Sequence, residues 1–299
     1  EGGILALFSL VKKMRMKWLY LIAIIGASAL VADGVITPSL TVMASIEGLK
    51  QIKGLELGIN PILAITTIIL VVIFVIQQFG TSFIGKFFGP IMVIWFLFLG
   101  IMGIINLQYH PEILKSFNPY YAYKLIVNSP KALWILGAVF LCTTGAEALY
   151  SDLGHCGAKN IRVSWFFVKV MLILNYLGQG SWLLKNYEMV FTGTNPFFGM
   201  LPQFLIIPAV ILATAAAIIA SQALITGSFT IFSEAMSLNF WPFQQIEYPS
   251  GLKGQMYIPR INWGLLIMCI VVVFYFKESV HMEAAYGLSI TVTMLMTTV

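Results

Sequence analysis

The sequence from Trp18 to Ile46 reads WLYLIAIIGASALVADGVITPSLTVMASI. It is almost entirely apolar and exceeds the roughly 20 residues that a helix needs to cross about 30 Å of hydrocarbon. In lipid, a helix satisfies its own backbone hydrogen bonds, whereas an irregular segment cannot. The stretch therefore predicts a transmembrane helix with one carboxylate, that of Asp33, near its middle.

The composition extends this reading to the whole chain. Of its 299 residues, 59% are hydrophobic and 10% are charged, whereas soluble domains carry roughly 45–50% apolar and about 25% charged residues. This excludes soluble, disordered and collagen-like proteins, and the net charge of +5 is not gathered into a face that would bind nucleic acid. The three cysteines are far apart, so we expect no disulfide, no structural metal and no cofactor.

Further apolar stretches punctuated by short polar segments predict about eight spans in one transmembrane domain covering residues 1–299. After the first, these are Asn60–Gln77, Phe87–Leu107, Ala132–Tyr150, Trp165–Leu184, Phe204–Thr226, Ile261–Phe276 and an incomplete span from Glu283 onward. The segment Gln108–Pro130, rich in proline and tyrosine, is expected to be irregular and half-buried at the headgroup level. The fold class is an all-α polytopic membrane protein.

Basic residues indicate the orientation, because Lys and Arg in short loops are retained on the cytoplasmic side. A cytoplasmic location for the residues before Trp18 places Arg15, Arg162 and Arg260 all inside. We expect a multi-pass protein of the plasma membrane, in contact with the lipid bilayer. Because the chain opens with Glu1 and stops within an apolar run, we also expect it to be a piece of a longer protein.

Asp33 is the first candidate site residue, because a carboxylate within a span is costly and persists mainly where it serves a cavity, an ion path or a partner. Thr37 lies four residues on, on the same helix face, and Thr41 continues the stripe. Pro38 has no N–H, so the carbonyl of Gly34 loses its helical partner. Carboxylate, hydroxyl and carbonyl oxygens are ligands for a dehydrated alkali cation; a purely structural acid is the alternative.

Glu147 is the second candidate, with Thr143 and Thr144 one turn before it on adjoining faces. Hydroxyls, small residues and an acid at membrane depth are typical of secondary-transporter binding sites. A structural acid near the interface is the alternative. Asn175 and Gln179, four residues apart, could line a polar pathway or join neighbouring helices by hydrogen bonds.

Several motifs occur together in order: Asp33–Pro38, Ile46–Leu49, Gly85–Met92, Thr144–Tyr150, Asp152–His155 and Asn175–Gly180. The combination resembles the KUP/HAK/KT family of potassium uptake transporters. The resemblance implies a LeuT-like fold of the APC superfamily, with two inverted five-helix repeats, of which this chain holds roughly helices three to ten. The fold is then incomplete at both ends, since the first helices and the C-terminal region are missing.

The resemblance further implies potassium uptake by proton symport. In this reading K+ binds through Asp33 and Thr37, Asp33 or Glu147 carries the proton, and Tyr150 joins Asn175 and Gln179 along the pathway. The partners are K+ and H+, and a homodimer is left open. The alternatives are a channel-like uniporter, although no Thr-Val-Gly-Tyr-Gly filter is present, and an amino-acid transporter of the same fold. An enzyme is not expected, since neither a His-Glu-x-x-His motif nor a deep aspartyl pair occurs.

Overall fold

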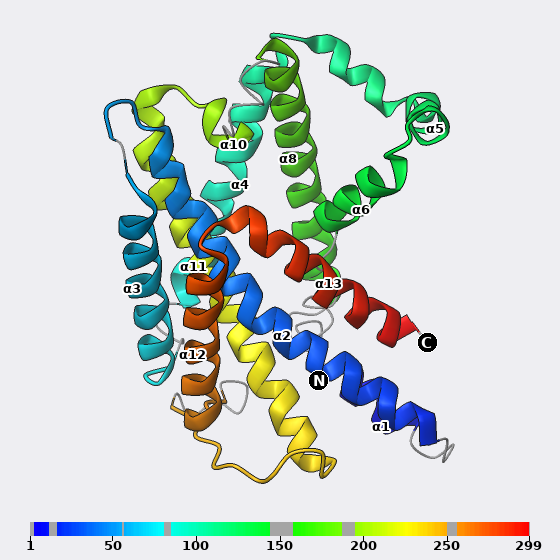
Figure 1. The fold of residues 1–299 in the computed structure, drawn as a ribbon, viewed down its shortest axis with the longest axis vertical. Coiled ribbons are helices and arrows are strands. Elements are labelled where there is room, and N and C mark those ends of the chain that lie inside the picture. The colour runs from blue at the N-terminus through cyan, green and yellow to red at the C-terminus, as the bar shows by residue number, and fades with distance from the viewer. Residues whose placement is uncertain are drawn as a thin grey trace.

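The computed structural model describes residues 3–11, 17–55, 57–80, 85–143, 158–186, 195–249 and 256–298. Within these ranges the protein is helical (Figure 1), and its one β-bridge joins Glu247 to Tyr257. The all-α prediction is therefore confirmed for the described part of the chain.

Six described helices are long and apolar enough to cross a membrane. They are α2 (Lys17–Glu47), α3 (Ile59–Gln77), α4 (Gly85–Leu107), α8 (Ala158–Lys185), α11 (Gln203–Ser237) and α12 (Pro259–Phe276). Each contains a predicted span, but α11 runs well beyond the predicted end at Thr226. The hydroxyls after that point do not end the helix, because Thr226, Ser228 and Thr230 each donate to a backbone carbonyl four residues back.

Shorter helices complete the described part. They are α1 (Ile4–Val11), η2 (Gly48–Gln51), η3 (Pro111–Phe117), α5 (Pro119–Asn128), α6 (Ala132–Thr143), α10 (Pro196–Gly199) and α13 (Ser279–Thr298). The predicted span Ala132–Tyr150 is thus described only as far as Thr143. The predicted C-terminal span is helical as α13, which is not among the six.

Helix α2 lies at the centre of the main bundle, in contact with α3, α11, α12 and α13. The largest cluster of buried apolar side chains joins these helices, with Val42 of α2, Phe74 of α3, Phe229 of α11 and Val273 of α12 all fully buried. Lipid is as apolar as these side chains, so the helices associate mainly through close packing and polar contacts rather than through the hydrophobic effect. The bundle is thus a packed scaffold around the middle of α2.

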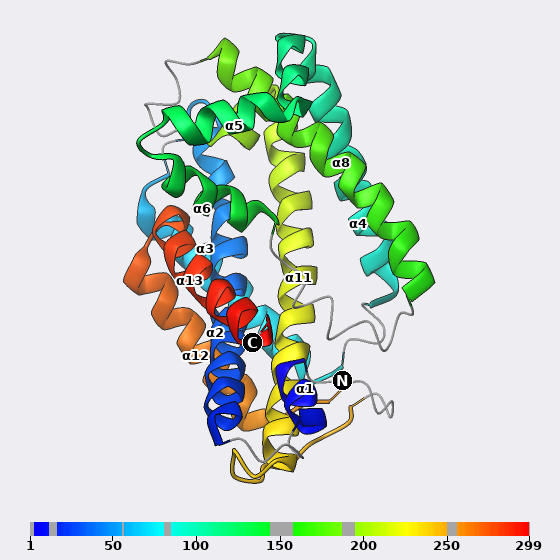
Figure 2. The ribbon, with the colours of Figure 1, turned by 90° about the vertical axis from the view of Figure 1, so that its right-hand side faces the viewer.

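Helices α4 and α8 form a second packed unit and lie side by side in Figure 2. Their crossing is made by glycines: a Cβ on Gly178 would lie 2.9 Å from the carbonyl carbon of Gly103. A Cβ on Gly100 would overlap the sulfur of Met171. Small residues at such a crossing let two backbones approach closely in the membrane. The unit reaches the main bundle through a contact between α4 and α11.

The segment Gln108–Pro130 differs from the prediction of an irregular, half-buried loop. It forms η3 and α5, and most of its side chains are exposed. Pro111 and Pro119 each stand in the first turn of one of these helices, where a missing N–H costs nothing and the fixed φ favours the helix. The Asn118 side chain also accepts a hydrogen bond from the Tyr120 backbone N–H and caps α5. The prolines therefore begin helices here instead of excluding them.

Candidate cation site

Asp33 lies in the middle of α2 and is 7% exposed, the one charged side chain that is buried among the described residues. The Thr37 hydroxyl donates to Asp33 Oδ1 over 2.6 Å. This is the contact that the spacing of four residues predicts. The hydroxyl oxygen and the carboxylate are therefore adjacent on one helix face, within reach of a common ligand.

Pro38 and Thr41 shape the backbone around this pair. Pro38 lies within α2 and cannot donate to the carbonyl of Gly34, which loses its usual helical hydrogen bond. One turn further on, the Thr41 hydroxyl donates to the carbonyl of Thr37 over 2.8 Å. The hydroxyl proton of Thr41 is therefore used within the helix, while its oxygen stays on the face that carries Asp33.

Gly34 is the point at which α11 approaches the candidate site. A Cβ at this position would overlap the hydroxyl of Ser228, which is 2% exposed and donates to the carbonyl of Leu224 over 2.9 Å. Nothing in the local sequence around Ser228 pointed to it. Gly34 was the available signal, because a glycine beside a membrane carboxylate permits a neighbouring helix to approach closely.

Helix α12 is joined to α2 two residues after Asp33. The Ser39 hydroxyl donates to the carbonyl of Val35 over 2.9 Å and lies 3.3 Å from the carbonyl of Cys269. The Cys269 thiol donates to the same Val35 carbonyl over 3.3 Å. Ser39 and Cys269 are both fully buried. These contacts hold the backbone that follows Asp33 in place, and no sequence pattern indicated that Ser39 and Cys269 meet.

The end of α2 is fixed by a different contact. The Glu47 carboxylate accepts from the backbone N–H of Ser279 over 3.1 Å and from the Ser279 hydroxyl. Ser279 is the first residue of α13, where helix N–H groups lack partners within the helix. Glu47 therefore caps α13 and ties it to α2.

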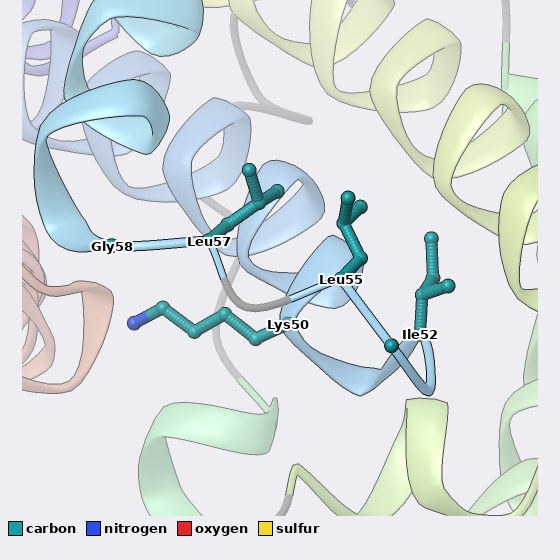
Figure 3. A pocket seen from close by; sticks show the side chains of 6 residues that line it. Lys50, Ile52, Leu55, Leu57 and Gly58 are labelled. Atoms are coloured by element: carbon teal, nitrogen blue, oxygen red, sulfur yellow. The ribbon is translucent and has the colours of Figure 1, made fainter.

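A pocket of about 520 Å³ lies beyond this end of α2, between η2 and α3 (Figure 3). It is lined by Lys50, Ile52, Gly54, Leu55, Leu57 and Gly58. Among the described lining residues, the one charged side chain is that of Lys50, and the other side chains are apolar. The described side chains of the pocket therefore offer no cation ligand, and none of the residues of the Asp33 site lines it.

The second predicted group is not brought into the described site. Thr144, Glu147 and Tyr150 lie outside the described residues, and Thr143 is described only by its backbone at the end of α6. Asn175 is buried on α8, and its backbone nitrogen lies beside Gly103 at the crossing of α4 and α8. Gln179 is half-buried one turn later. Both lie on the helix that packs mainly on α4, so their pathway role stays a prediction.

The helices and the buried carboxylate–hydroxyl pair define an all-helical, multi-pass membrane protein. The chain belongs to the family described as "K+ potassium transporter integral membrane domain", whose sequence model matches residues 1–299. This confirms the family resemblance that the motifs indicated.

Curated relatives cover the whole chain. A "Probable potassium transport system protein Kup" of Flavobacterium psychrophilum is 53% identical over 304 residues, which are 100% of this chain and 46% of the relative. "Probable potassium transport system protein Kup 1" of Lactococcus lactis is 56% identical, with 100% and 45% covered. The protein of that name in Lactobacillus acidophilus is 55% identical, with 100% and 47% covered. The chain thus spans about half the length of the curated relatives it matches, and no solved structure matches it.

Proposed function

We propose that the full-length gene product imports K+ across the plasma membrane together with protons. The observation that carries the proposal is the buried Asp33 carboxylate, which accepts a hydrogen bond from Thr37 in the middle of a membrane helix. The family assignment and the names of the relatives, which are potassium transport proteins, support the same substrate. The proposed architecture is a LeuT-like pair of inverted five-helix repeats, completed by segments beyond this chain.

The proposed cation site uses oxygen atoms that surround Asp33. A carboxylate at the centre of a span costs about 2.5–3.5 kcal/mol on insertion scales, and a dehydrated cation beside it offsets its charge. Thr37 supplies a hydroxyl oxygen, Gly34 supplies a carbonyl without its helical donor, and Thr41 extends the same face. Together they replace the water that K+ loses on entering the membrane.

Proton coupling is proposed from the two membrane acids. Protonation of Asp33 would remove the charge that holds the cation, so a proton and K+ compete for this carboxylate. Glu147 is proposed as the acid that carries the proton while Asp33 holds K+. Each charge that crosses 100 mV gains about 2.3 kcal/mol, so a co-transported proton roughly doubles the electrical driving force for accumulation.

The test is rubidium uptake by cells that lack other potassium importers and express the full-length gene product. Asp33→Asn should abolish uptake, and Glu112→Gln is the matched control, because it makes the same acid-to-amide change at a carboxylate that is 75% exposed. Uptake should saturate and, at a fixed membrane potential, should rise as the external medium is made more acidic. Flux that ignores the proton gradient would indicate a channel-like uniporter, and competition by labelled amino acids would indicate an amino-acid transporter. Normal uptake by Asp33→Asn at normal membrane levels would refute the site.

A further inference from the structure

Three buried side-chain amides from three helices meet at the last turn of α3. They are Gln77 of α3 itself, Gln222 of α11 and Asn262 of α12, which are 5%, 4% and 0% exposed. The nearest described charged residues along the chain, Glu247 before α12 and Arg260 in its first turn, are exposed. This group, which we call the α3 amide cluster, is therefore buried, polar and uncharged.

Hydrogen bonds fix which way each amide points. Gln222 Nε2 donates to the carbonyl of Ile73 over 3.3 Å, and Asn262 Nδ2 donates to the next carbonyl, that of Phe74, over 3.1 Å. A carbonyl can only accept, so the nitrogen of each amide must face α3 and the oxygen must point elsewhere.

Gln77 is oriented by the same logic through a hydroxyl. Thr226 donates its proton to the carbonyl of Gln222 over 2.9 Å, so it accepts from Gln77 Nε2 over 3.3 Å. Gln77 lies four residues after Ile73 and so shares its helix face. The three amides are thereby linked around one turn of α3.

Their oxygens have no such partners. Within the described ranges, five buried side-chain oxygens accept no hydrogen bond, and three of them are Gln77 Oε1, Gln222 Oε1 and Asn262 Oδ1. Buried polar groups are nearly always paired, so each exception needs an explanation. Interhelical hydrogen bonding accounts for the amide nitrogens and leaves these three oxygens unexplained.

The chemistry of the cluster favours a cation over a neutral molecule. The C-terminus of a helix carries a partial negative charge, and the cluster surrounds the last turn of α3. Broken or terminating helices use such ends to hold monovalent cations in transporters. Divalent cations instead prefer carboxylates, and none is buried in the cluster. A dehydrated ion of the K+ class suits neutral oxygens sealed from solvent.

We propose that the α3 amide cluster is a second binding site for a dehydrated monovalent alkali cation, held by the oxygens of Gln77, Gln222 and Asn262. The inference rests on the proposed transport function, which brings such ions into the protein. It adds a second ion-binding site to the one proposed at Asp33. It lies in the same main bundle as Asp33 but shares no ligand with that site.

The test is the number of Rb+ ions bound by the purified full-length gene product in detergent, at constant ionic strength with choline as the replacement ion. The unaltered protein should bind two ions, and Asp33→Asn should retain one. Gln77→Met and Asn262→Leu should each also retain one, and adding either to Asp33→Asn should abolish binding. Ser221→Ala is the matched control, since Ser221 is buried beside Gln222 and donates to Ala217 of its own helix; it should bind two.

Gln77→Met is the variant expected to fold, because it keeps the hydrogen bonds that Gln222 and Asn262 donate to the α3 carbonyls. Melting curves in choline identify any variant that has unfolded. Two ions bound by a folded Gln77→Met or Asn262→Leu would overturn the inference and leave the amides as interhelical contacts or a water site. Loss of all binding in a folded Asp33→Asn would also overturn it. Neither result tests the proposed transport function, which is tested separately by rubidium uptake.

Discussion

Replacing Gly103 with alanine probes the crossing of α4 and α8. The new Cβ would overlap the carbonyl of Leu174 and lie 2.7 Å from the backbone nitrogen of Asn175. Backbone atoms cannot rotate away as a side chain can, so the two helices must separate. Overpacking of this kind costs about 1–3 kcal/mol, and 1–2 kcal/mol already lowers the ratio of folded to unfolded protein roughly 5–30-fold.

Gly264→Ala is the matched control, because it makes the same change inside a membrane helix, α12, at an exposed position where no atom of another segment lies within 4 Å of the new Cβ. Alanine is the better helix former, so this variant should be as stable as the parent. Thermal unfolding of the full-length gene product in detergent, followed by size-exclusion chromatography, compares the two. Equal melting temperatures for Gly103→Ala and Gly264→Ala would show that the crossing is looser than the structure indicates.

Four further outcomes are expected. Asp33→Glu keeps the charge but adds a methylene, so it should retain partial rubidium uptake with weaker apparent affinity. Thr37→Ala removes a proposed neutral ligand and should impair uptake less than Asp33→Asn. Greater loss of uptake in Thr37→Ala than in Asp33→Asn would contradict the ligand roles. Glu147→Gln keeps the shape but cannot exchange a proton, so uptake should lose pH dependence, and an unchanged pH profile would exclude Glu147 as the carrier. A cysteine replacing Lys159 should resist an impermeant reagent applied outside intact cells, and labelling there would reverse the topology. Ser279→Ala removes the hydroxyl that donates to the Glu47 carboxylate but keeps the backbone N–H bond. Loss of a hydrogen bond to a charged group should cost about 1.5–3 kcal/mol, measured by thermal unfolding against Ser9→Ala at the exposed surface.

The sequence was most informative where the contact is local. Asp33 and Thr37 lie one helical turn apart, so their spacing alone predicts the hydrogen bond that the structure shows. The six long apolar helices were predictable for the same reason, since their length and composition are properties of continuous segments.

Contacts between distant segments could not be predicted in this way. Ser39 and Cys269 are 230 positions apart, and neither residue type nor periodicity indicates which faces of α2 and α12 meet. Ser228 lies beyond the predicted end of the span at Thr226, and its hydroxyl is satisfied within its own helix. Pro111 was misread because a proline gives the same signal whether it begins a helix or interrupts one.

The length of α2 has a consequence for electrical behaviour. Its 31 residues extend about 46 Å at 1.5 Å per residue, well beyond the roughly 30 Å of hydrocarbon. A helix of this length tilts in the bilayer or projects into the headgroup layers. Asp33 lies about 24 Å from Lys17 and about 21 Å from Glu47 by the same rise, which places it near the middle of the insulating layer. A cation held at this carboxylate has therefore crossed about half of the transmembrane voltage, worth roughly 1.2 kcal/mol per 100 mV. The membrane potential would thus act directly on the affinity of the cation site proposed at Asp33.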